Sequence, residues 1–390
     1  MNNNCLLSAW NKYWFEEKSR ESFCLIRIFF GLVFLVKLTF FIPLLREGVV
    51  NIIIPKFTLY DTGLFHIEGF RNAVPGFEWL PVPSFTQYQN IEIIIIILAV
   101  LFTIGLFTRY VGPVLAIIYT YLFLISQHNY HHHVFLIVIV LYILGFSNCY
   151  MHYSMDSYLG LNKEKDGNIK YLPIRLLQVL ISIVYLFSFL HKCNHGWLTG
   201  ELTYLYYQQG TVSGYLVNLI DSIFSVGFLS DYKIHFWKLL GPLTVITEGF
   251  LAFAIWIPRL RRFAIFVGLI FHSMIFMFIN VETFSFQMWV LYMAFIHTES
   301  KQNKVYYNGN NVCDLRFIRI CKLLDWFKRI ELINSNNKNI YAVGLDNKQM
   351  TGVVSSYLFV FSLFPITFIP AYIVNIFYSV FNRGKMVNVK

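Results

Sequence analysis

The segment LPIRLLQVLISIVYLFSFLHKCNHGWLTG (172–200) decides how this chain folds. Its first part is almost entirely apolar, and about 20 such residues cross the hydrocarbon core of a bilayer as a helix. The run ends on Lys192, with an imidazole beside it at His191 and an indole shortly after it at Trp197. The segment therefore predicts a transmembrane helix with a titratable amine at its end.

The composition of the whole chain agrees with a membrane protein. Of 390 residues, 57% are hydrophobic and only 13% are charged, which is too apolar for one or two soluble domains. The net charge is +10, but the basic residues are dispersed among loops and form no dense stripe, so we expect no nucleic-acid partner. The six cysteines show neither disulfide-framework nor zinc-site spacing.

Apolar runs long enough to span a bilayer recur along the chain. We expect an all-α polytopic bundle of about eight transmembrane helices, near 23–45, 91–108, 111–127, 133–148, 173–192, 239–257, 262–281 and 283–298. Residues 1–22 carry acidic and aromatic residues and no small-residue cleavage pattern, which favours an interfacial N-terminal helix over a removed signal peptide.

The loops predict the orientation, because Lys and Arg are retained on the cytoplasmic side. With a cytoplasmic N terminus, most basic groups lie in inner connections, namely Arg109, Lys163 to Lys170, Arg259 to Arg262 and Lys301 to Lys348. The long loops 46–90 and 193–238 then face outward. Lys192 and the histidine-rich segment QHNYHHH (127–133) both fall at the outer side.

Four further ionisable residues lie inside expected spans: Arg27, Lys37, Glu248 and His272. Charges at such depth cost several kcal/mol, so they normally face the bundle interior and pair. Other interpretations stay open, since Lys37 and Lys192 lie near helix ends where lysines snorkel, and Glu248 with His272 suits a structural pair. Successive histidines on a helix point about 100° apart, so we expect no metal site at 131–133.

The order of these features resembles the membrane domain of the vitamin K-dependent γ-carboxylase family, the HTTM family. The matching features are Arg27 with Gly31, GLFTR (105–109), NYHHH (129–133), the MD of YSMD (153–156), HKCNHGWLTG (191–200), Glu248 and FHSMIFMFINVETFSF (271–286). The resemblance covers residues 23–298. We therefore expect an HTTM-like transmembrane domain over 23–299.

The resemblance implies a quinol-dependent γ-glutamyl carboxylase. In that family a membrane-embedded lysine takes a proton from a reduced naphthoquinone, either vitamin K hydroquinone or menaquinol. Oxygenation of the quinol to an epoxide then drives removal of a γ-proton from a peptide glutamate, and the carbanion captures CO2. Lys192 matches that lysine and His133 the family histidine. The supporting pocket is expected to include Asn129, His132, His191, Trp197, Glu248, His272 and Arg27.

Two other classes of function remain to be weighed. Bacterial relatives similar to the sporulation-delaying toxin maturation protein share the bundle, which makes a non-carboxylating maturation factor for a secreted peptide the alternative. A transporter is disfavoured because the sequence has no internal repeat. Whether the protein is a carboxylase or a maturation factor, we expect an integral protein of a bacterial inner membrane that meets its peptide on the extracytoplasmic side.

Residues 300–390 resemble a different family, the thioredoxin-like DCC family, through VYYNGNNVCDLRFIRICKLLD (305–325). The two cysteine positions of that family fall on Asn311 and Asp314, so we expect a small, degenerate and redox-inactive α/β module. The apolar end 353–381 is either a ninth span or helices that pack on the module or the membrane surface. Pro365 and Pro370 in its middle favour the second interpretation.

Overall fold

The computed structural model describes residues 3–15, 17–18, 21–41, 73–125, 131–161, 169–212, 215–225, 227–279, 281, 283–296, 303–326, 329–335, 340–344, 349–350, 353–364 and 367–381. The chain divides into two compact units. The first comprises Met1–Glu16 and Phe23–Phe295, and the second comprises Glu17–Ser22 and Ile296–Lys390.

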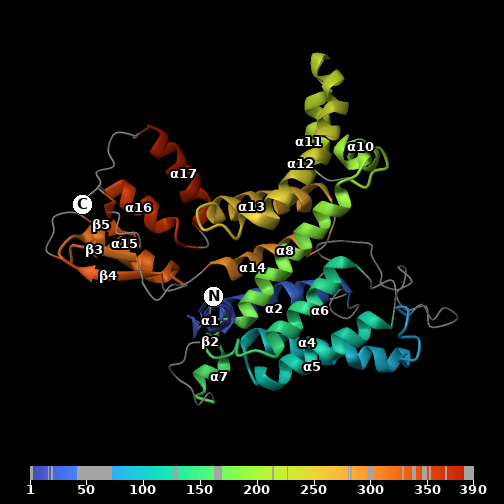
Figure 1. Cartoon of the computed structure of the whole chain (residues 1–390), viewed down its shortest axis with the longest axis horizontal. Helices are drawn as coiled ribbons and strands as arrows, with labels where there is room; N and C mark the ends of the chain where they lie inside the picture. The colour runs from blue at the N-terminus through green and yellow to red at the C-terminus, as the bar shows by residue number, and fades with distance from the viewer. Residues whose placement is uncertain are drawn as a thin grey trace. The chain divides into compact units, whose positions relative to one another are not determined.

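The first unit is built from helices (Figure 1). In chain order they are α1 (Asn3–Phe15), α2 (Glu21–Phe41), α4 (Phe85–Ile104), α5 (Thr108–Leu124), α6 (His132–Gly145), α7 (Met155–Tyr158), α8 (Leu172–Lys192), α9 (His195–Leu198), α10 (Glu201–Gln208), α11 (Tyr215–Phe224), α12 (Lys233–Ala254), α13 (Arg261–Phe278) and α14 (Phe284–Leu291). Two 3₁₀ helices, η3 (Gly227–Tyr232) and η4 (Tyr292–Phe295), and a short strand, β2 (Ile169–Lys170), complete it.

Each expected apolar run overlaps with one of these helices, although the bounds of the helices and of the runs differ. Within the described residues, three helices are long and apolar enough to cross a membrane, at Leu172–Lys192, Ser230–Ala254 and Arg261–Phe278. The expectation of about eight spans is therefore supported for three. One reason lies in the backbone: α4 ends at Gly105, whose φ of 78° closes the helix in the left-handed conformation, inside the apolar run.

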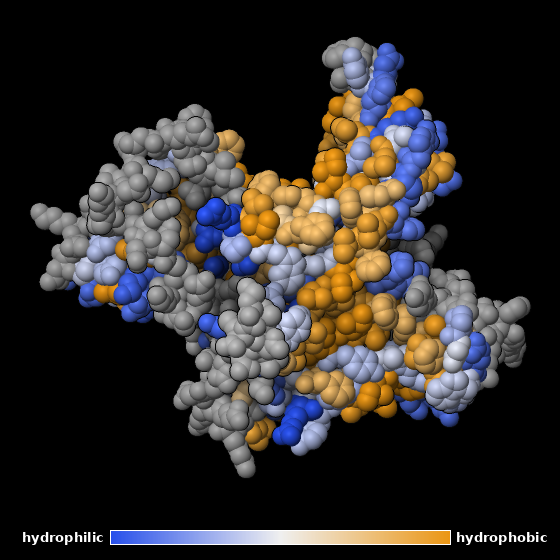
Figure 2. Space-filling model, in the orientation of Figure 1, coloured by the Kyte–Doolittle hydropathy of each residue, from blue (hydrophilic) through white to orange (hydrophobic). Residues whose placement is uncertain are grey.

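Apolar side chains cover the exposed faces of the three long helices. Phe187 on α8 is 65% exposed, and Ile246 and Phe253 on α12 are 66% and 61% exposed. Figure 2 shows hydrophobic surface over α8, α12 and α13. Exposed apolar surface of this extent is typical of a face that meets lipid.

Helices α5 and α6 approach each other through two glycines. A Cβ atom on Gly112 would lie 2.6 Å from the Cα atom of Gly145. Glycines at such a crossing let two helix backbones pack closely, as is common between transmembrane helices.

A buried carboxylate joins the two motifs GLFTR and YSMD. The carboxylate of Asp156 accepts hydrogen bonds from the backbone N–H groups of Phe107 (2.8 Å) and Thr108 (3.2 Å), at the start of α5. Arg27 donates from Nη2 to the carbonyl oxygen of Tyr153 at 2.5 Å. Orphan N–H groups at a helix N terminus favour a carboxylate, so this contact fixes where α5 begins.

The second unit contains a four-stranded sheet. The 2-residue strand β1 (Glu17–Lys18) also belongs to this unit but is not part of that sheet. Strand β3 (Asn303–Tyr307) continues through α15 (Val312–Leu324) into the parallel strand β4 (Ile330–Asn334). Strand β5 (Tyr341–Val343) pairs antiparallel with β3 and with β6 (Gln349–Met350), so the order is β4-β3-β5-β6. The unit has its own apolar core, made by residues such as Val305, Phe317, Cys321 and Val360.

The apolar end of the chain forms two helices, α16 (Val353–Phe361) and α17 (Phe368–Phe381). Helix α16 packs on the sheet, since Ser356 Oγ accepts a hydrogen bond from the backbone N–H of Ala342 at 3.2 Å. Val360 and Phe364, at and after its end, belong to the core of the second unit. Helix α16 is therefore packed on the sheet of the second unit, as the second interpretation expects for this part of the chain.

Candidate functional site

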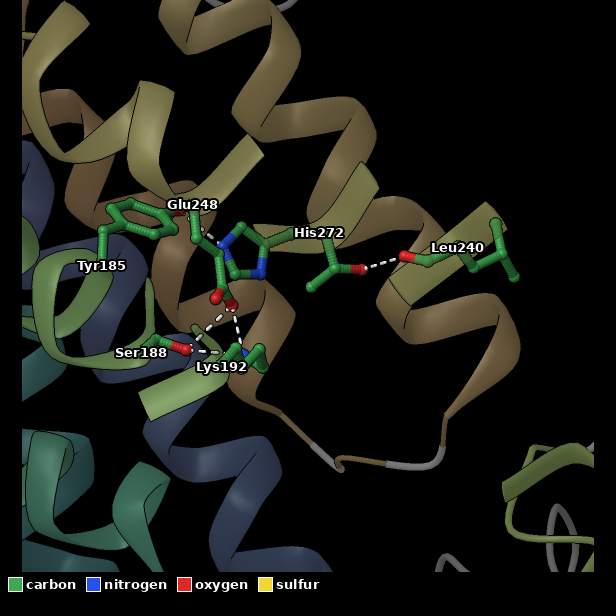
Figure 3. Close-up of polar contacts among 7 residues, drawn as sticks. Tyr185, Ser188, Lys192, Leu240, Glu248 and His272 are labelled. Carbon is green, nitrogen blue, oxygen red and sulfur yellow. Dashed lines mark hydrogen bonds and ion pairs between the residues drawn. The ribbon is translucent and has the colours of Figure 1, made fainter. Parts of the chain in front are cut away.

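Lys192 ends α8 inside a cluster of polar side chains. Its Nζ atom lies 2.6 Å from Glu248 Oε1 on α12 and donates to Ser188 Oγ at 2.6 Å (Figure 3). Ser188 in turn donates to the same Glu248 oxygen at 2.9 Å. The side chains of Lys192 and Glu248 are only 17% and 7% exposed. The amine is therefore held within the protein by two oxygen acceptors, which is not the extended pose of a snorkelling lysine.

The sequence of the two helices explains this contact. Ser188 precedes Lys192 by one helical turn, so both side chains lie on the same face of α8. Gly249 follows Glu248, and a Cβ atom there would meet the ring of Phe189 at 2.9 Å. Because glycine lacks that atom, α12 approaches α8 closely enough for the carboxylate to reach the amine.

The segment that follows Lys192 brings an indole to the amine. Asn194 is the N-cap of α9, since its Oδ1 accepts a hydrogen bond from the backbone N–H of Trp197 at 3.2 Å. The centre of the Trp197 ring lies 5.2 Å from Lys192 Nζ. A cation within about 6 Å of an indole ring is attracted to its electron-rich face. The N-H-G-W sequence thus places a third contact on the amine, after those of Ser188 and Glu248.

A second polar group lies between α8, α13 and η4, where Tyr185 precedes Lys192 by two helical turns. Tyr185 OH lies 2.7 Å from His272 Nε2 on α13 and is also hydrogen bonded to Tyr292 OH. Figure 3 shows His272 and Glu248 pointing into the same region between α8, α12 and α13. Two buried atoms here, Glu248 Oε2 and His272 Nδ1, have no hydrogen-bond partner among the described residues. The sequence suggested His272 as a partner of Glu248, whereas the described ion pair of Glu248 is with Lys192.

The structure places His133 with a different lysine. His133 Nε2 lies 3.2 Å from Lys37 Nζ on α2, and the ring of His131 stacks on that of His133 with centroids 5.3 Å apart. Lys37 is 1% exposed. This lysine is therefore also buried against an imidazole, and a snorkelling role does not describe it.

The remaining predicted site residues are dispersed. His132, the first residue of α6, and His191 on α8 are exposed. Arg27 belongs to the buried contact with the Tyr153 carbonyl described above. Asn129 lies outside the described residues. The structure thus brings together Lys192, Glu248 and Trp197, and separately His133 with Lys37.

Sequence reasoning missed three members of these groups, Ser188, Tyr185 and Tyr292. The first two carried a usable signal, because they precede Lys192 by four and seven residues and so share its face of α8. Tyr292 comes from a distant segment, and no local pattern links it to Tyr185.

Long apolar helices with ionisable side chains gathered between them define a polytopic helical membrane protein. A family model described as the HTTM domain matches residues 15–299, which is most of the chain, and the chain belongs to that family. The HTTM domain is associated with vitamin K-dependent carboxylase-like membrane proteins. No curated protein and no solved structure matches the chain.

Proposed function

We propose that this protein is a quinol-dependent γ-glutamyl carboxylase-like enzyme of a bacterial inner membrane. It couples oxygenation of a reduced naphthoquinone to carboxylation of glutamates in a peptide, consuming O2 and CO2. One observation carries the proposal: the Lys192 amine is held 2.6 Å from both Ser188 Oγ and Glu248 Oε1 instead of extending to the interface. The two acceptors fix the position of the amine, as proton transfer to or from it requires, whereas an anchor needs no such partners.

The residues around Lys192 fit a reduced naphthoquinone, which is an aromatic diol. Such a ligand needs acceptors for its hydroxyl groups and aromatic surroundings for its rings. Glu248 Oε2 and His272 Nδ1 supply two buried polar atoms without described partners. Trp197, Phe284 and Tyr292 supply aromatic rings close to Lys192 or to His272. When bound, the quinol supplies a hydroxyl group whose oxygenation chemistry yields a strong base.

Each residue of the cluster then has a distinct task. Lys192 takes the hydroxyl proton as a general base, and its contacts with Ser188 and Glu248 hold the amine in place. Ser188 and Glu248 fix the direction of the amine, and Trp197 covers one side of it. The Tyr185–His272 hydrogen bond holds the imidazole in one orientation beside the site.

We assign the peptide-modifying half of the reaction to His133 with Lys37. An imidazole beside a buried amine is suited to moving protons near a peptide carboxylate. His132, His191 and Asn129 belong to the same outward side in the predicted topology, where the peptide would approach. Arg27 has a positioning role in this proposal, since its described hydrogen bond is to backbone.

We further propose that the second unit is the degenerate DCC module. Its parallel β3–α15–β4 unit followed by an antiparallel hairpin supports a thioredoxin-like fold. The side chains of both residues at the expected cysteine positions accept hydrogen bonds from backbone N–H groups. Asn311 Oδ1 caps α15 by accepting from the Cys313 N–H at 2.9 Å, and Asp314 accepts from the Asn308 N–H at 2.9 Å. Such a module offers docking, not thiol chemistry.

The test of the enzyme is formation of quinone epoxide by purified protein. Wild type, Lys192→Ala and Lys192→Arg are supplied with reduced menaquinone or vitamin K and oxygen, and epoxide is followed by chromatography. Both variants should lose about 10²–10⁴ in rate, because alanine removes the base and arginine does not release its proton. The matched control is Lys238→Ala, which removes a lysine of α12 outside the cluster. Its rate of epoxide formation should resemble that of wild type.

The second candidate is a non-carboxylating maturation factor for a secreted peptide. The Lys192–Glu248 ion pair also suits this candidate, because an ion pair between α8 and α12 can hold the two helices together without any catalytic role. Equal epoxide yields from wild type and Lys192→Ala, or a Lys192→Ala variant that still matures its peptide in cells, would establish this candidate.

A further inference from the structure

We infer that Glu248 takes up a proton from Lys192 when Lys192 deprotonates the quinol, so that the lysine is a relay and the glutamate holds the additional proton. The inference rests on the proposed function and names a second catalytic residue for it. It starts from the contact at 2.6 Å between Lys192 Nζ and Glu248 Oε1, over which a proton moves by less than the length of a hydrogen bond.

The proton balance of the site supports this assignment. At rest the cluster holds a lysine ammonium and a glutamate carboxylate, with a combined charge of zero. The ammonium passes one proton to Glu248 Oε1, which leaves a free amine and a neutral carboxylic acid. The amine then takes the proton from the hydroxyl group of the bound quinol and is an ammonium again. The hydroxyl oxygen has gained the negative charge that Glu248 gave up.

The net charge of the cluster together with the bound quinol is therefore zero at every stage. This matters because Glu248 is buried within α12, and an uncompensated charge inside a protein or bilayer costs several kcal/mol. A mechanism in which Lys192 alone accepted the proton would begin with a free amine beside an unpaired carboxylate. It would thus begin from a net negative site, which the relay avoids.

The unequal surroundings of the two carboxylate oxygens are a second, independent observation. Oε1 accepts from both Lys192 and Ser188, whereas Oε2 is buried and has no hydrogen-bond partner among the described residues. An ionised carboxylate offers about four acceptor positions, so half of this group is left without a donor. Oε2 is thus available to a proton or to the hydroxyl group of a ligand.

Infrared spectroscopy tests whether Glu248 takes up a proton, without any quinol. Removing the partner amine in Lys192→Ala leaves a buried carboxylate uncompensated, and such a group becomes protonated. We expect the carbonyl stretch of a carboxylic acid to appear in Lys192→Ala at neutral pH, and to be missing in wild type and in Lys192→Ala/Glu248→Gln. A Lys192→Ala spectrum without that band would overturn the inference.

The same band should report the relay in the wild-type protein. Reduced menaquinone added without oxygen should produce the acid band in wild type and leave Glu248→Gln unchanged. If quinol binding produces no acid band in wild type, the proton does not reach the glutamate and the inference fails.

Activity separates failure of this inference from failure of the proposed function. Glu248→Gln keeps the shape of the side chain but accepts no proton, and we expect it to lose about 10² in the rate of epoxide formation. Glu248→Ala should also lose activity and should regain part of it on addition of formate, which shows that the variant is folded. Wild type without epoxide formation would reject the enzyme; wild-type epoxide formation with an equally active Glu248→Gln would reject only the relay.

Discussion

Lys192 and Lys37 show that two lysines of this protein have chemically different partners. Lys192 meets a carboxylate and a hydroxyl, whereas Lys37 meets the imidazole of His133 at 3.2 Å. The chemistry of their partners differs, because an ionised carboxylate only accepts hydrogen bonds, whereas a neutral imidazole can both donate and accept them. We therefore expect the two lysines to act in different halves of the reaction.

At this scale we predict that His133→Ala and Lys37→Met uncouple the reaction. Both should reduce carboxylation of the peptide more than epoxide formation, since neither side chain belongs to the Lys192 cluster. The measurement is the ratio of labelled carbon dioxide fixed in a peptide to epoxide formed, in the same reaction. Lys192→Ala should lower both products together, and a parallel loss of both products in His133→Ala would contradict the assignment.

Individual helices show what the sequence could predict. Helix α8 was expected near 173–192 and covers Leu172–Lys192, because its apolar run is uninterrupted. Helix α12 was expected near 239–257 but begins earlier, at Lys233, since polar residues such as His235 and Lys238 do not end a helix. A hydropathy pattern marks the part of a helix that lipid covers, and capping or glycine decides its ends.

The candidate site likewise has a part that the sequence could predict and a part that it could not. Lys192, Glu248 and His133 could be named from their motifs and from the cost of charge inside a membrane. The pairing of Lys192 with Glu248 and of His133 with Lys37 could not, because each joins residues more than 50 positions apart. Local spacing predicts which side chains share a face of one helix and is silent on which helix lies opposite.

The crossing of α5 and α6 yields a prediction about stability. Gly112→Ala adds a Cβ atom at 2.6 Å from the Cα atom of Gly145, and overpacking of this kind costs about 1–3 kcal/mol. The midpoint of thermal unfolding in detergent should fall. Val114→Leu changes an exposed residue of the same helix and should leave the midpoint unchanged. An unaltered midpoint in Gly112→Ala would show that the two backbones lie farther apart.

Helix α15 yields a prediction about thiol chemistry. Cys313 is exposed, whereas Cys321 is buried in the core of the second unit, and burial raises the pKa of the Cys321 thiol to about 12. Only the thiolate reacts, so at neutral pH a maleimide should label Cys313 at once and Cys321 only after unfolding. Protein that retains one of these cysteines at a time allows the measurement. Rapid labelling of folded Cys321 would contradict the buried position.

The same pair bears on the role of the module. Because no resolving thiol stands at the motif positions, Cys313→Ser and Cys321→Ala should leave epoxide formation at the wild-type level. Loss of activity at normal protein levels would mean that a working thiol is present after all.

The orientation of the whole molecule in the membrane is the largest feature that the sequence predicts and that experiment has to decide. The alternation of basic loops predicts that 46–90 and 193–238 face outward and that 304–350 lies in the cytoplasm. In a cysteine-free variant, Ser222→Cys should react with an impermeant maleimide on intact cells and Lys322→Cys only after lysis. Both positions are exposed in the structure. The reverse pattern would invert the topology.

The Lys192–Glu248 contact also has a consequence for biogenesis. Helix α8 is synthesised before α12. Its lysine stands at the helix end, where the amine can reach the lipid headgroups until α12 is inserted. Glu248 lies well inside α12, where a charged residue opposes insertion by about 2.5–3.5 kcal/mol. A lysine already in place offers that carboxylate a counterion as it leaves the translocon. The order of the two helices along the chain therefore suits the order in which they enter the bilayer.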